Sequence, residues 1–247
     1  MTELAYLVDP SAAYIRTFRA TVRALPPGGV VLDRTYFYPT GGGQPNDRGN
    51  LRGAADALEV VDVSKSGASV VHRVRGSGPP LGGVRVGDAV EGTIDWERRF
   101  RHMRLHTGQH LLSARIFGRT RLRTRRATMA GTEALLDLEG PIAEELVAPL
   151  SDDLAGAVSD PRSVSIRYVA RAEWDRNPAA ERVGLVPLPP AVDPVRVVEI
   201  DATDVCPCGG THLRSTGELG PIRLRRERGG ERVVLTLGDV AAPTRAT

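Results

Sequence analysis

Apolar and polar positions alternate with a period of two along the first part of the chain, a pattern typical of short β-strands. The alternation is clear at residues 18–24, and comparable runs at 30–38, 58–63, 69–74 and 89–94 are separated by glycine and proline. About five strands of this size predict a small β-barrel. We assign this N-terminal barrel to residues 1–95.

The pattern changes at Trp96, where a continuous segment without proline begins. It runs through Phe117 to Gly118, which predicts a helix that stops at the glycine. Strand-like and helix-like segments then mix, as in an α+β domain, which we assign to residues 96–247. The predicted strands are 128–138, 163–169, 195–200 and 232–237, helices are expected after Pro141 to about residue 158 and near Glu173, and residues 177–194 are expected to be irregular.

The composition, the apolar runs and the cysteines indicate the cellular location to expect for the protein. The chain has 247 residues, of which 41% are hydrophobic and 26% charged, an ordinary composition for a folded domain. No apolar run approaches the roughly 20 residues of a membrane span, and the N-terminus lacks the layout of a secretory signal. Cys206 and Cys208 stand one residue apart, too close to cross-link distant segments. We therefore expect a cytoplasmic protein with no membrane partner.

Positive charge is concentrated in one part of the chain. The formal net charge is only +3, yet residues 98–126 contain ten arginines and no carboxylate. Such a segment favours a polyanionic partner, with nucleic acid as the first candidate. The alternative is a solvated helix face.

Two histidines provide the first candidate chemistry. His106 and His110 lie four residues apart in the string HTGQH, on the predicted helix. Four residues are about one helical turn, so both imidazoles leave the same face and can reach a single ion. No glutamate lies between them, which excludes the metalloprotease helix that carries its own general base. The alternative is two polar residues on a half-exposed face.

A second pair of candidate ligands lies about a hundred residues later, in the string CPCGGTH. Cys208 and His212 flank two glycines and a threonine, and the glycines allow a loop to close tightly around an ion. Taken singly, Cys208 is also explained as a small buried residue and His212 as a turn residue. Together the two pairs supply His, His, Cys and His, a ligand set that suits zinc.

The sequence leaves the role of this zinc open. Four protein ligands in a tetrahedral array would make it structural, whereas catalysis needs an open position. Cys206 is a spare thiol that either replaces a ligand or simply packs. In an open site, zinc would activate a bound water or hold the substrate, and this chemistry leads to hydrolysis. No side chain is assigned as a catalytic acid or base.

A glycine-rich string, YPTGGGQP, follows the second predicted strand. Consecutive glycines can cradle a phosphate, a ribose or a peptide backbone, so Gly42, Gly43 and Gln44 are candidate substrate contacts. The spacing matches neither the P-loop nor the dinucleotide fingerprint. An ordinary loop is the alternative.

Three strings in order, FYPTGGGQPNDRG, HTGQHLLSA and CPCGGTHL followed by STGELG, resemble those of the alanyl-tRNA editing proteins. These are freestanding relatives of the editing domain of alanyl-tRNA synthetase. The resemblance extends from about Val31 to about Leu237, and three motifs in order are far more specific than any one. The N-terminal region is similar to that of the medium-length class, which joins a β-barrel to the editing core.

The resemblance implies a ligand set, a reaction and a partner. The family's zinc positions fall on His106, His110, Cys208 and His212, and Cys206 lies outside them. The implied reaction is hydrolysis of the ester that joins serine, or in some classes glycine, to the 3′ end of alanine tRNA. The implied contacts to the tRNA backbone come from the arginine-rich segment, namely Arg115, Arg119, Arg121, Arg123, Arg125 and Arg126.

The resemblance also implies a residue that recognises the amino acid. The family uses a polar side chain on the strand after the histidine helix, which by position is Thr128, and Gln109 is a second candidate. A pocket that must hydrogen-bond the hydroxyl of serine rejects alanine far better than an apolar pocket could. Thr128 supplies such a group.

Two other functions remain open from the sequence. The first is a deacylase of another misacylated tRNA, such as threonine tRNA that carries the wrong amino acid, because motifs define the chemistry better than the side-chain pocket. The second is a non-catalytic tRNA-binding module with a structural zinc. It would bind RNA in a salt-sensitive way without cleaving an ester.

Overall fold

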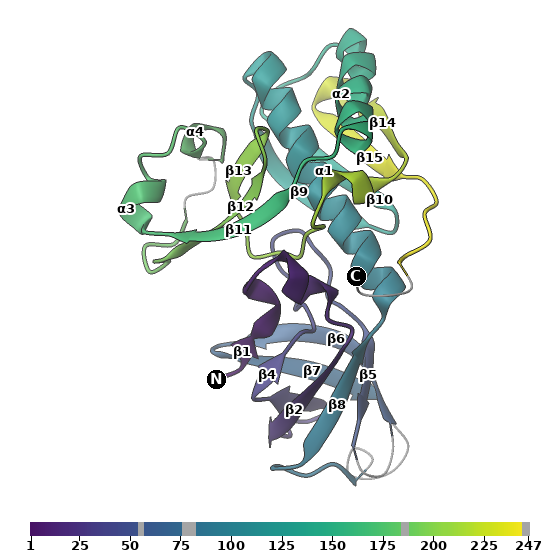
Figure 1. The fold of residues 1–247 in the computed structure, drawn as a ribbon, viewed down its shortest axis with the longest axis vertical. Coiled ribbons are helices and arrows are strands. Elements are labelled where there is room, and N and C mark those ends of the chain that lie inside the picture. Colours follow the sequence, from purple (N-terminus) through teal and green to yellow (C-terminus); the bar gives the residue numbers. More distant parts are fainter. Residues whose placement is uncertain (54–56, 76–82, 184–187, 244–247) are drawn as a thin grey trace. The chain divides into compact units, whose positions relative to one another are not determined.

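The computed structural model describes residues 1–53, 57–75, 83–183 and 188–243 (Figure 1). The chain divides into two compact units. The first comprises Met1–Arg101 together with residues of the C-terminal end from Ala242, and the second comprises His102–Ala241. Both helices and several sheets are present, which confirms the mixed α+β class. No helix among the described residues is both long and apolar enough to cross a membrane.

The first unit is a closed ring of six strands in the order β2, β3, β7, β6, β5, β8, and β8 pairs with β2 to complete it. A short parallel pair, β1 (Glu3–Leu4) with β4 (Arg34–Thr35), lies outside the ring. The ring strands are β2 (Thr17–Ala24), β3 (Gly29–Leu32), β5 (Gly49–Arg52), β6 (Ala57–Ser66), β7 (Ser69–Arg75) and β8 (Ala89–Ile94).

The alternation read from the sequence explains the interior of this ring. Phe18, Ala20 and Val22 on β2 are buried, whereas the residues between them are more exposed. Gly92 on β8 leaves room for the Phe18 ring, because a Cβ at this position would lie 2.5 Å from it. The predicted strand at 30–38 ends early, since the Asp33 carboxylate accepts the backbone N–H groups of Thr21 and Arg34 and interrupts the strand between β3 and β4.

Helix α1 (Trp96–Thr120) is the long helix that the proline-free segment predicts. The prediction that it stops at Gly118 is wrong, because the helix continues to Thr120. The turn that ends it is made by Arg121, which has a φ of 63° and donates its N–H to the Phe117 carbonyl at 2.8 Å. Thr120 Oγ1 then accepts the N–H of Leu122 at 3.1 Å.

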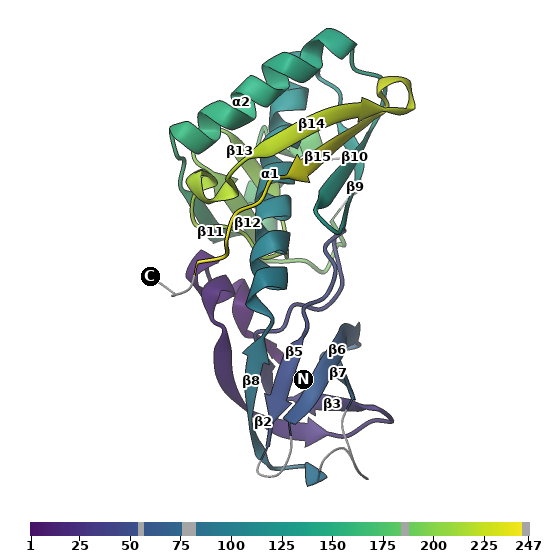
Figure 2. The same ribbon diagram turned by 90° about the vertical axis from the view of Figure 1, so that its right-hand side faces the viewer.

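The second unit contains two sheets. A four-stranded sheet has the order β14, β15, β10, β9, and a three-stranded sheet has the order β11, β12, β13. Helix α2 (Val147–Ser159) packs along β14 (Figure 2). The strands are β9 (Thr124–Ala130), β10 (Glu133–Leu138), β11 (Val164–Val169), β12 (Val195–Ile200), β13 (Asp204–Pro207), β14 (Ile222–Glu227) and β15 (Arg232–Leu237).

Two sequence predictions in this unit need correction. Residues 128–138 do not form one strand but the hairpin β9–β10, because Gly131 turns the chain with a φ of 57°. Within the segment expected to be irregular, a short helix α4 (Ala180–Val183) forms after α3 (Arg171–Trp174). Residues 184–187 of that segment lie outside the described part of the chain.

Most residues in the middle of α1 are buried. Leu105, Leu111, Leu112 and Ile116 have no exposed surface. Gly108 lets the helix approach β15 closely, because a Cβ there would lie 3.1 Å from Leu235. Polar groups on the middle of α1 are therefore held in a low-dielectric interior.

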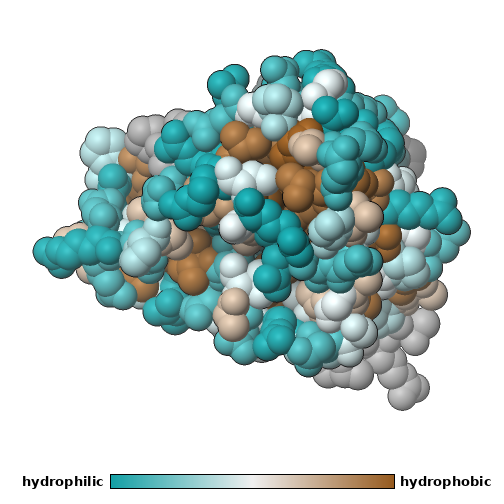
Figure 3. Space-filling view, turned by 90° about the horizontal axis from the view of Figure 1, so that it is seen from above, coloured by the Kyte–Doolittle hydropathy of each residue, from teal (hydrophilic) through white to brown (hydrophobic). Residues whose placement is uncertain are grey.

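The face of the molecule in Figure 3 is mainly hydrophilic, with separate hydrophobic patches between the polar side chains.

Candidate metal centre

Four side chains of the second unit converge from two segments. His106 and His110 lie one turn apart on α1 and are only 3% and 4% exposed. Cys208 and His212 belong to the loop that follows β13. This loop closes tightly, because the N–H of Gly210 donates to Cys208 Sγ at 3.3 Å. The structure thus brings together all four residues that the sequence predicts as metal ligands.

The geometry of this cluster suits a single ion. Cys208 Sγ lies 3.3 Å from His106 Nε2 and 3.3 Å from His212 Nε2. The ring centroids of His110 and His212 are 4.7 Å apart. One ligand atom from each of the four residues lies within 4.8 Å of the others. This arrangement of one sulfur and three nitrogens can hold a metal ion.

Neighbouring polar groups fix the orientation of two of the rings. His110 Nδ1 lies 3.0 Å from Asp204 Oδ2, and the Asp204 side chain is fully buried. His212 Nδ1 lies 3.2 Å from Thr107 Oγ1, which also accepts the N–H of Leu213. With Nδ1 engaged in each case, Nε2 is the nitrogen left for a metal, as is usual for metal-binding histidines. The donor set and its outer partners fit a bound metal.

The metal-free cluster shifts the pKa values of its members. Burial disfavours the Cys208 thiolate, but His106, His212 and His110 outweigh it and hold the pKa of the thiol well below its usual value. For His110, burial is likewise outweighed by the Cys208 thiolate and Asp204, and its pKa rises to about 9. Burial, then the charge of His106, lowers the pKa of His212 to about 3. Cys208 is thus prepared to bind as a thiolate.

Cys206 differs from Cys208 in its surroundings. Burial, and next the charge of Asp204, raises the pKa of its thiol. Cys206 lies with His110 and Asp204 in a second group of three possible ligands. Its thiol is therefore a weak ligand unless a metal displaces the proton.

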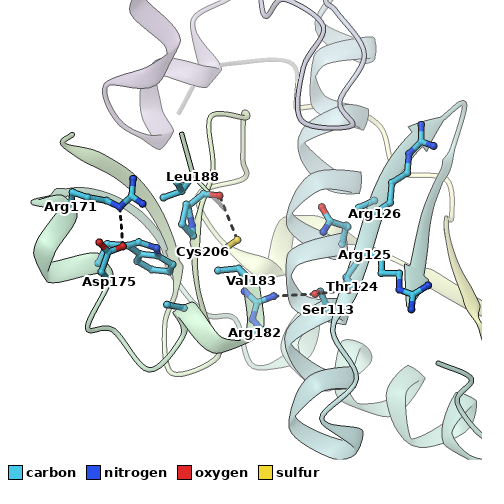
Figure 4. A pocket seen from close by; sticks show the side chains of 15 residues that line it. Ser113, Thr124, Arg125, Arg126, Arg171, Asp175, Arg182, Val183, Leu188 and Cys206 are labelled. Carbon is cyan, nitrogen blue, oxygen red and sulfur yellow. Dashed lines mark hydrogen bonds and ion pairs between the residues drawn. The ribbon is translucent and has the colours of Figure 1, made fainter. Parts of the chain in front are cut away.

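A cavity of about 510 Å³ lies beside α1, with Ser113 of this helix among its lining residues (Figure 4). One wall comes from α1 and β9, with Gln109, Ser113 and Thr124. The opposite wall includes Arg182 and Cys206. Because Gln109 stands directly before His110 and Cys206 lies two residues before Cys208, this cavity adjoins the segments that carry the metal cluster.

Of the two predicted recognition residues, the structure places one in this cavity. Gln109 lines it. Thr128 is half-buried on β9, where it pairs with Leu135 of β10, and it does not line the cavity. Thr124, four residues earlier on β9, does line it. Thr124 Oγ1 and Ser113 Oγ form a hydrogen bond of 2.9 Å.

The predicted tRNA-contacting arginines fall into two groups. Three are bound by carboxylates of the same unit, in the pairs Arg119–Asp153, Arg121–Glu181 and Arg123–Glu139. Arg125 and Arg126 are exposed and line the cavity, and Arg115 lies near Thr203 at 3.5 Å. The carboxylate pairs leave less of the segment's charge for a polyanion than the sequence suggests.

The glycine-rich string belongs to the first unit and forms a tight turn. Gly41 and Gln44 exchange two backbone hydrogen bonds of 3.1 and 2.9 Å. Gly42 and Gly43 occupy the centre of the turn with φ values of 56° and 79°, a conformation that favours glycine. Gln44 is buried. The turn accounts for the glycines, and contact of Gly42, Gly43 and Gln44 with a substrate stays a prediction.

Sequence reasoning missed Asp204, Ser113, Thr124 and Arg182. Each lies far along the chain from at least one of the groups it contacts, so no spacing rule could have joined them. The nearest signal is the position of Asp204 just before the cysteine motif.

Two parts of the chain match models of known protein families. Residues 12–98 match the family model of "tRNA synthetases class II (A)". Residues 195–234 match that of the "Threonyl and Alanyl tRNA synthetase second additional domain", which includes Cys208 and His212. These two parts of the chain are thus similar to domains of aminoacyl-tRNA synthetases.

Relatives over the whole chain identify the family. The chain is 36% identical to an alanine–tRNA ligase of Pyrococcus abyssi over 97% of its own length, but it spans only 26% of that ligase. It is 33% identical to the alanyl-tRNA editing protein AlaX-M of Methanosarcina mazei, with 92% of the chain and 91% of the relative covered. The same protein of Methanosarcina acetivorans is also 33% identical, with 93% of the relative covered. The chain belongs to the family of alanyl-tRNA editing proteins.

Proposed function

We propose that this chain is a zinc-dependent deacylase. It hydrolyses the ester that joins serine to alanine tRNA, with glycine on the same tRNA as a second substrate. The observation that carries the proposal is the convergence of His106, His110, Cys208 and His212 in a chain of the editing family. The two units then correspond to an N-terminal barrel and a zinc-binding editing domain.

The donor set favours zinc over other common metals. One thiolate and three imidazoles suit zinc, whereas magnesium and calcium prefer oxygen ligands. A zinc ion held here would supply a Lewis acid for ester hydrolysis. Asp204 and Thr107 orient His110 and His212, so that these ligands need not reorganise when the metal binds.

The cavity beside α1 supports a site for the aminoacyl end of the tRNA. Its volume of about 510 Å³ is in the range of small-molecule sites. Gln109 lines it, and its side-chain amide would hydrogen-bond a hydroxyl of the amino acid. Thr124 and Ser113 add two more hydroxyl groups to the same lining. Hydrogen bonds to the serine hydroxyl would separate serine from alanine.

Arg125 and Arg126 are the arginines best placed to meet the RNA. Both are exposed on β9 at the cavity, whereas Arg119 and Arg123 are each held by two hydrogen bonds to one carboxylate. Contacts from exposed arginines to phosphates would position the acceptor end without reading its sequence.

Two alternatives remain. The matched family model is named for threonyl as well as alanyl synthetases, which favours a deacylase of misacylated threonine tRNA as the second candidate. The approach of all four ligand atoms within 4.8 Å also suits a closed structural zinc, as in a non-catalytic tRNA-binding module.

One experiment separates these functions by changing the amino acid and the tRNA independently. Deacylation is measured for serine and alanine on alanine tRNA, and for serine on threonine tRNA, with a His106→Ala, Cys208→Ala variant in parallel. Loss of serine from alanine tRNA alone, abolished in the variant, is the expected result. Faster loss from threonine tRNA supports the second candidate. Binding of tRNA without any cleavage would leave the binding module.

A further inference from the structure

A buried carboxylate stands behind the metal ligand His110. Asp204, at the start of β13, places Oδ2 3.0 Å from His110 Nδ1, and its side chain is fully buried. With the Nδ1–H of His110 donated to this carboxylate, Nε2 carries the lone pair that faces Cys208 and His212. Asp204 thereby sets both the tautomer and the tilt of the ring.

A second residue donates a hydrogen bond to Oδ1, the other oxygen of the Asp204 carboxylate. Arg182 of α4 donates from Nη2 to Asp204 Oδ1, and its side chain is only 9% exposed. From Nη1 it donates to Ser113 Oγ at 3.0 Å, and Ser113 lies one turn after His110 on α1. Figure 4 shows Arg182 reaching across to Ser113. One guanidinium therefore connects β13 to the helix that carries His110.

The planar fork of arginine makes this connection rigid. Two nitrogens of one guanidinium bind two acceptors at a fixed separation, which a lysine cannot do. Without Arg182, His110 would be the remaining side-chain partner of the buried Asp204 carboxylate among the residues that the structure describes. An uncompensated buried charge is unfavourable, so the carboxylate would turn toward another donor. The ring of His110 would then lose its fixed orientation.

We propose that Arg182 is a positioning residue for the metal ligand His110 and acts through Asp204. The proposal rests on the metal centre proposed above. Arg182 donates hydrogen bonds to Asp204 and Ser113, so its effect on the metal ligand passes through the carboxylate that binds His110. The same side chain lines the cavity, so it also connects α4 to the metal site.

The test measures metal binding instead of activity. Cobalt(II) is titrated into the full chain, and its absorption spectrum reports the ligand geometry, while competition with a chelator gives the zinc affinity. We expect Arg182→Gln and Asp204→Asn each to weaken zinc binding by about 10-fold to 100-fold and to change the cobalt spectrum. The double variant should bind zinc no less tightly than whichever single variant binds it less tightly, because both substitutions interrupt one chain of contacts.

Two further variants keep the result interpretable. Arg167→Gln removes an arginine that pairs with Glu199 at 2.8 Å on another strand, and it should bind zinc as the wild type does. Arg182→Lys keeps the positive charge but not the planar guanidinium, and its zinc affinity should lie between those of the wild type and Arg182→Gln. It also serves if Arg182→Gln does not fold, as judged by circular dichroism.

Each outcome decides between the proposals. Wild-type zinc affinity and an unchanged cobalt spectrum in folded Arg182→Gln, or in Arg182→Lys if only that variant folds, would overturn the role of Arg182 and leave the metal centre intact. Failure of the wild-type protein to bind cobalt or zinc would overturn the metal centre, and this proposal with it. An equal loss in Arg167→Gln would also overturn it, since the effect would not be specific to the Asp204 contact.

Discussion

His110 lies between a thiolate and a carboxylate, and this position governs how a metal can enter the cluster. Burial opposes its protonated form, but Cys208 and Asp204 raise the pKa of its ring to about 9. A proton on Nε2 and a metal compete for the same lone pair. Below pH 9 the metal must therefore displace a proton from this histidine.

The resulting prediction is that zinc affinity rises with pH. His212 is already neutral at pH 7, since its pKa is lowered to about 3, and its neighbours hold the pKa of the Cys208 thiol well below the usual value. Between pH 7 and about 9 the affinity should rise about tenfold per pH unit for the proton of His110. Chelator competition at several pH values, corrected for the chelator's own protonation, measures the slope. A flat profile contradicts the assignment of His110 as a ligand.

At the residue scale, spacing in the sequence found the ligands but not the groups behind them. His106 with His110, and Cys208 with His212, each follow a four-residue spacing that local geometry explains. Asp204 and Arg182 act through contacts across the fold, which no spacing reveals. The resemblance points to Thr128 on the strand after the histidine helix, and this strand, β9, begins four residues earlier at Thr124.

Gly118 is the element-scale feature that tests the helix. It lies inside α1, and a Cβ added there would meet nothing within 4 Å. Alanine in a helix interior is more stable than glycine by about 0.5 to 1 kcal/mol. We expect Gly118→Ala to raise the free energy of unfolding by about this amount, as measured by urea denaturation. A destabilised variant would mean that the helix ends near Gly118 after all.

Two strands that sequence reasoning missed, β13 and β14, share a physical cause. β14 carries arginine at alternate positions, so it contains no continuous hydrophobic run that would mark it as a strand. β13 is four residues long and ends in a proline, which does not read as a strand in isolation. Both strands exist because neighbouring strands supply the hydrogen bonds and the packing, which a local pattern does not contain.

The first unit contains a buried histidine that makes its stability depend on pH. His72 has no exposed surface, and its Nε2 lies 2.8 Å from Thr35 Oγ1 while Nδ1 lies 3.0 Å from the Val30 carbonyl. Burial lowers its pKa from 6.5 to about 4. Between pH 6.5 and about 4, His72 is protonated in the unfolded chain but neutral in the folded chain, so acid favours unfolding.

The prediction is a loss of stability in mild acid. The contribution of His72 is complete above pH 6.5 and is lost as the pH falls through 4, by about 3 kcal/mol in total. Denaturant unfolding at pH 7.5 and pH 4.5 measures this loss, and His72→Gln should show less of it, because an amide does not titrate in this range. Equal losses in both proteins would assign the effect to other groups.

At the scale of the whole molecule, charge along the sequence overstates the charge available to a partner. Arg119 is held by Asp153 through hydrogen bonds of 2.8 and 2.9 Å. Arg126 is exposed on β9, and its cross-strand neighbour Asp137 is bound by Arg232. From the sequence, the segment with ten arginines favours a polyanionic partner. The carboxylates that bind some of these arginines come from distant parts of the chain.

We therefore expect the two arginines to differ in tRNA binding. Arg126→Ala should weaken binding and reduce the dependence of the logarithm of affinity on the logarithm of salt concentration by about one phosphate contact. Arg119→Ala, the matched control, should change both much less. Binding isotherms at several salt concentrations give these slopes. The reverse order would show that tRNA meets the other end of the segment.

The measurement that tests zinc-dependent editing most directly is the hydrolysis of Ser-tRNA(Ala) by chelator-treated protein, before and after zinc is returned. Ala-tRNA(Ala) serves as the substrate control, magnesium as the metal control, and Cys208→Ser as the variant that lacks one ligand. We predict that zinc alone restores the loss of serine, that alanine is spared, and that Cys208→Ser stays inactive. Full hydrolysis by the metal-free protein or by Cys208→Ser would contradict the account.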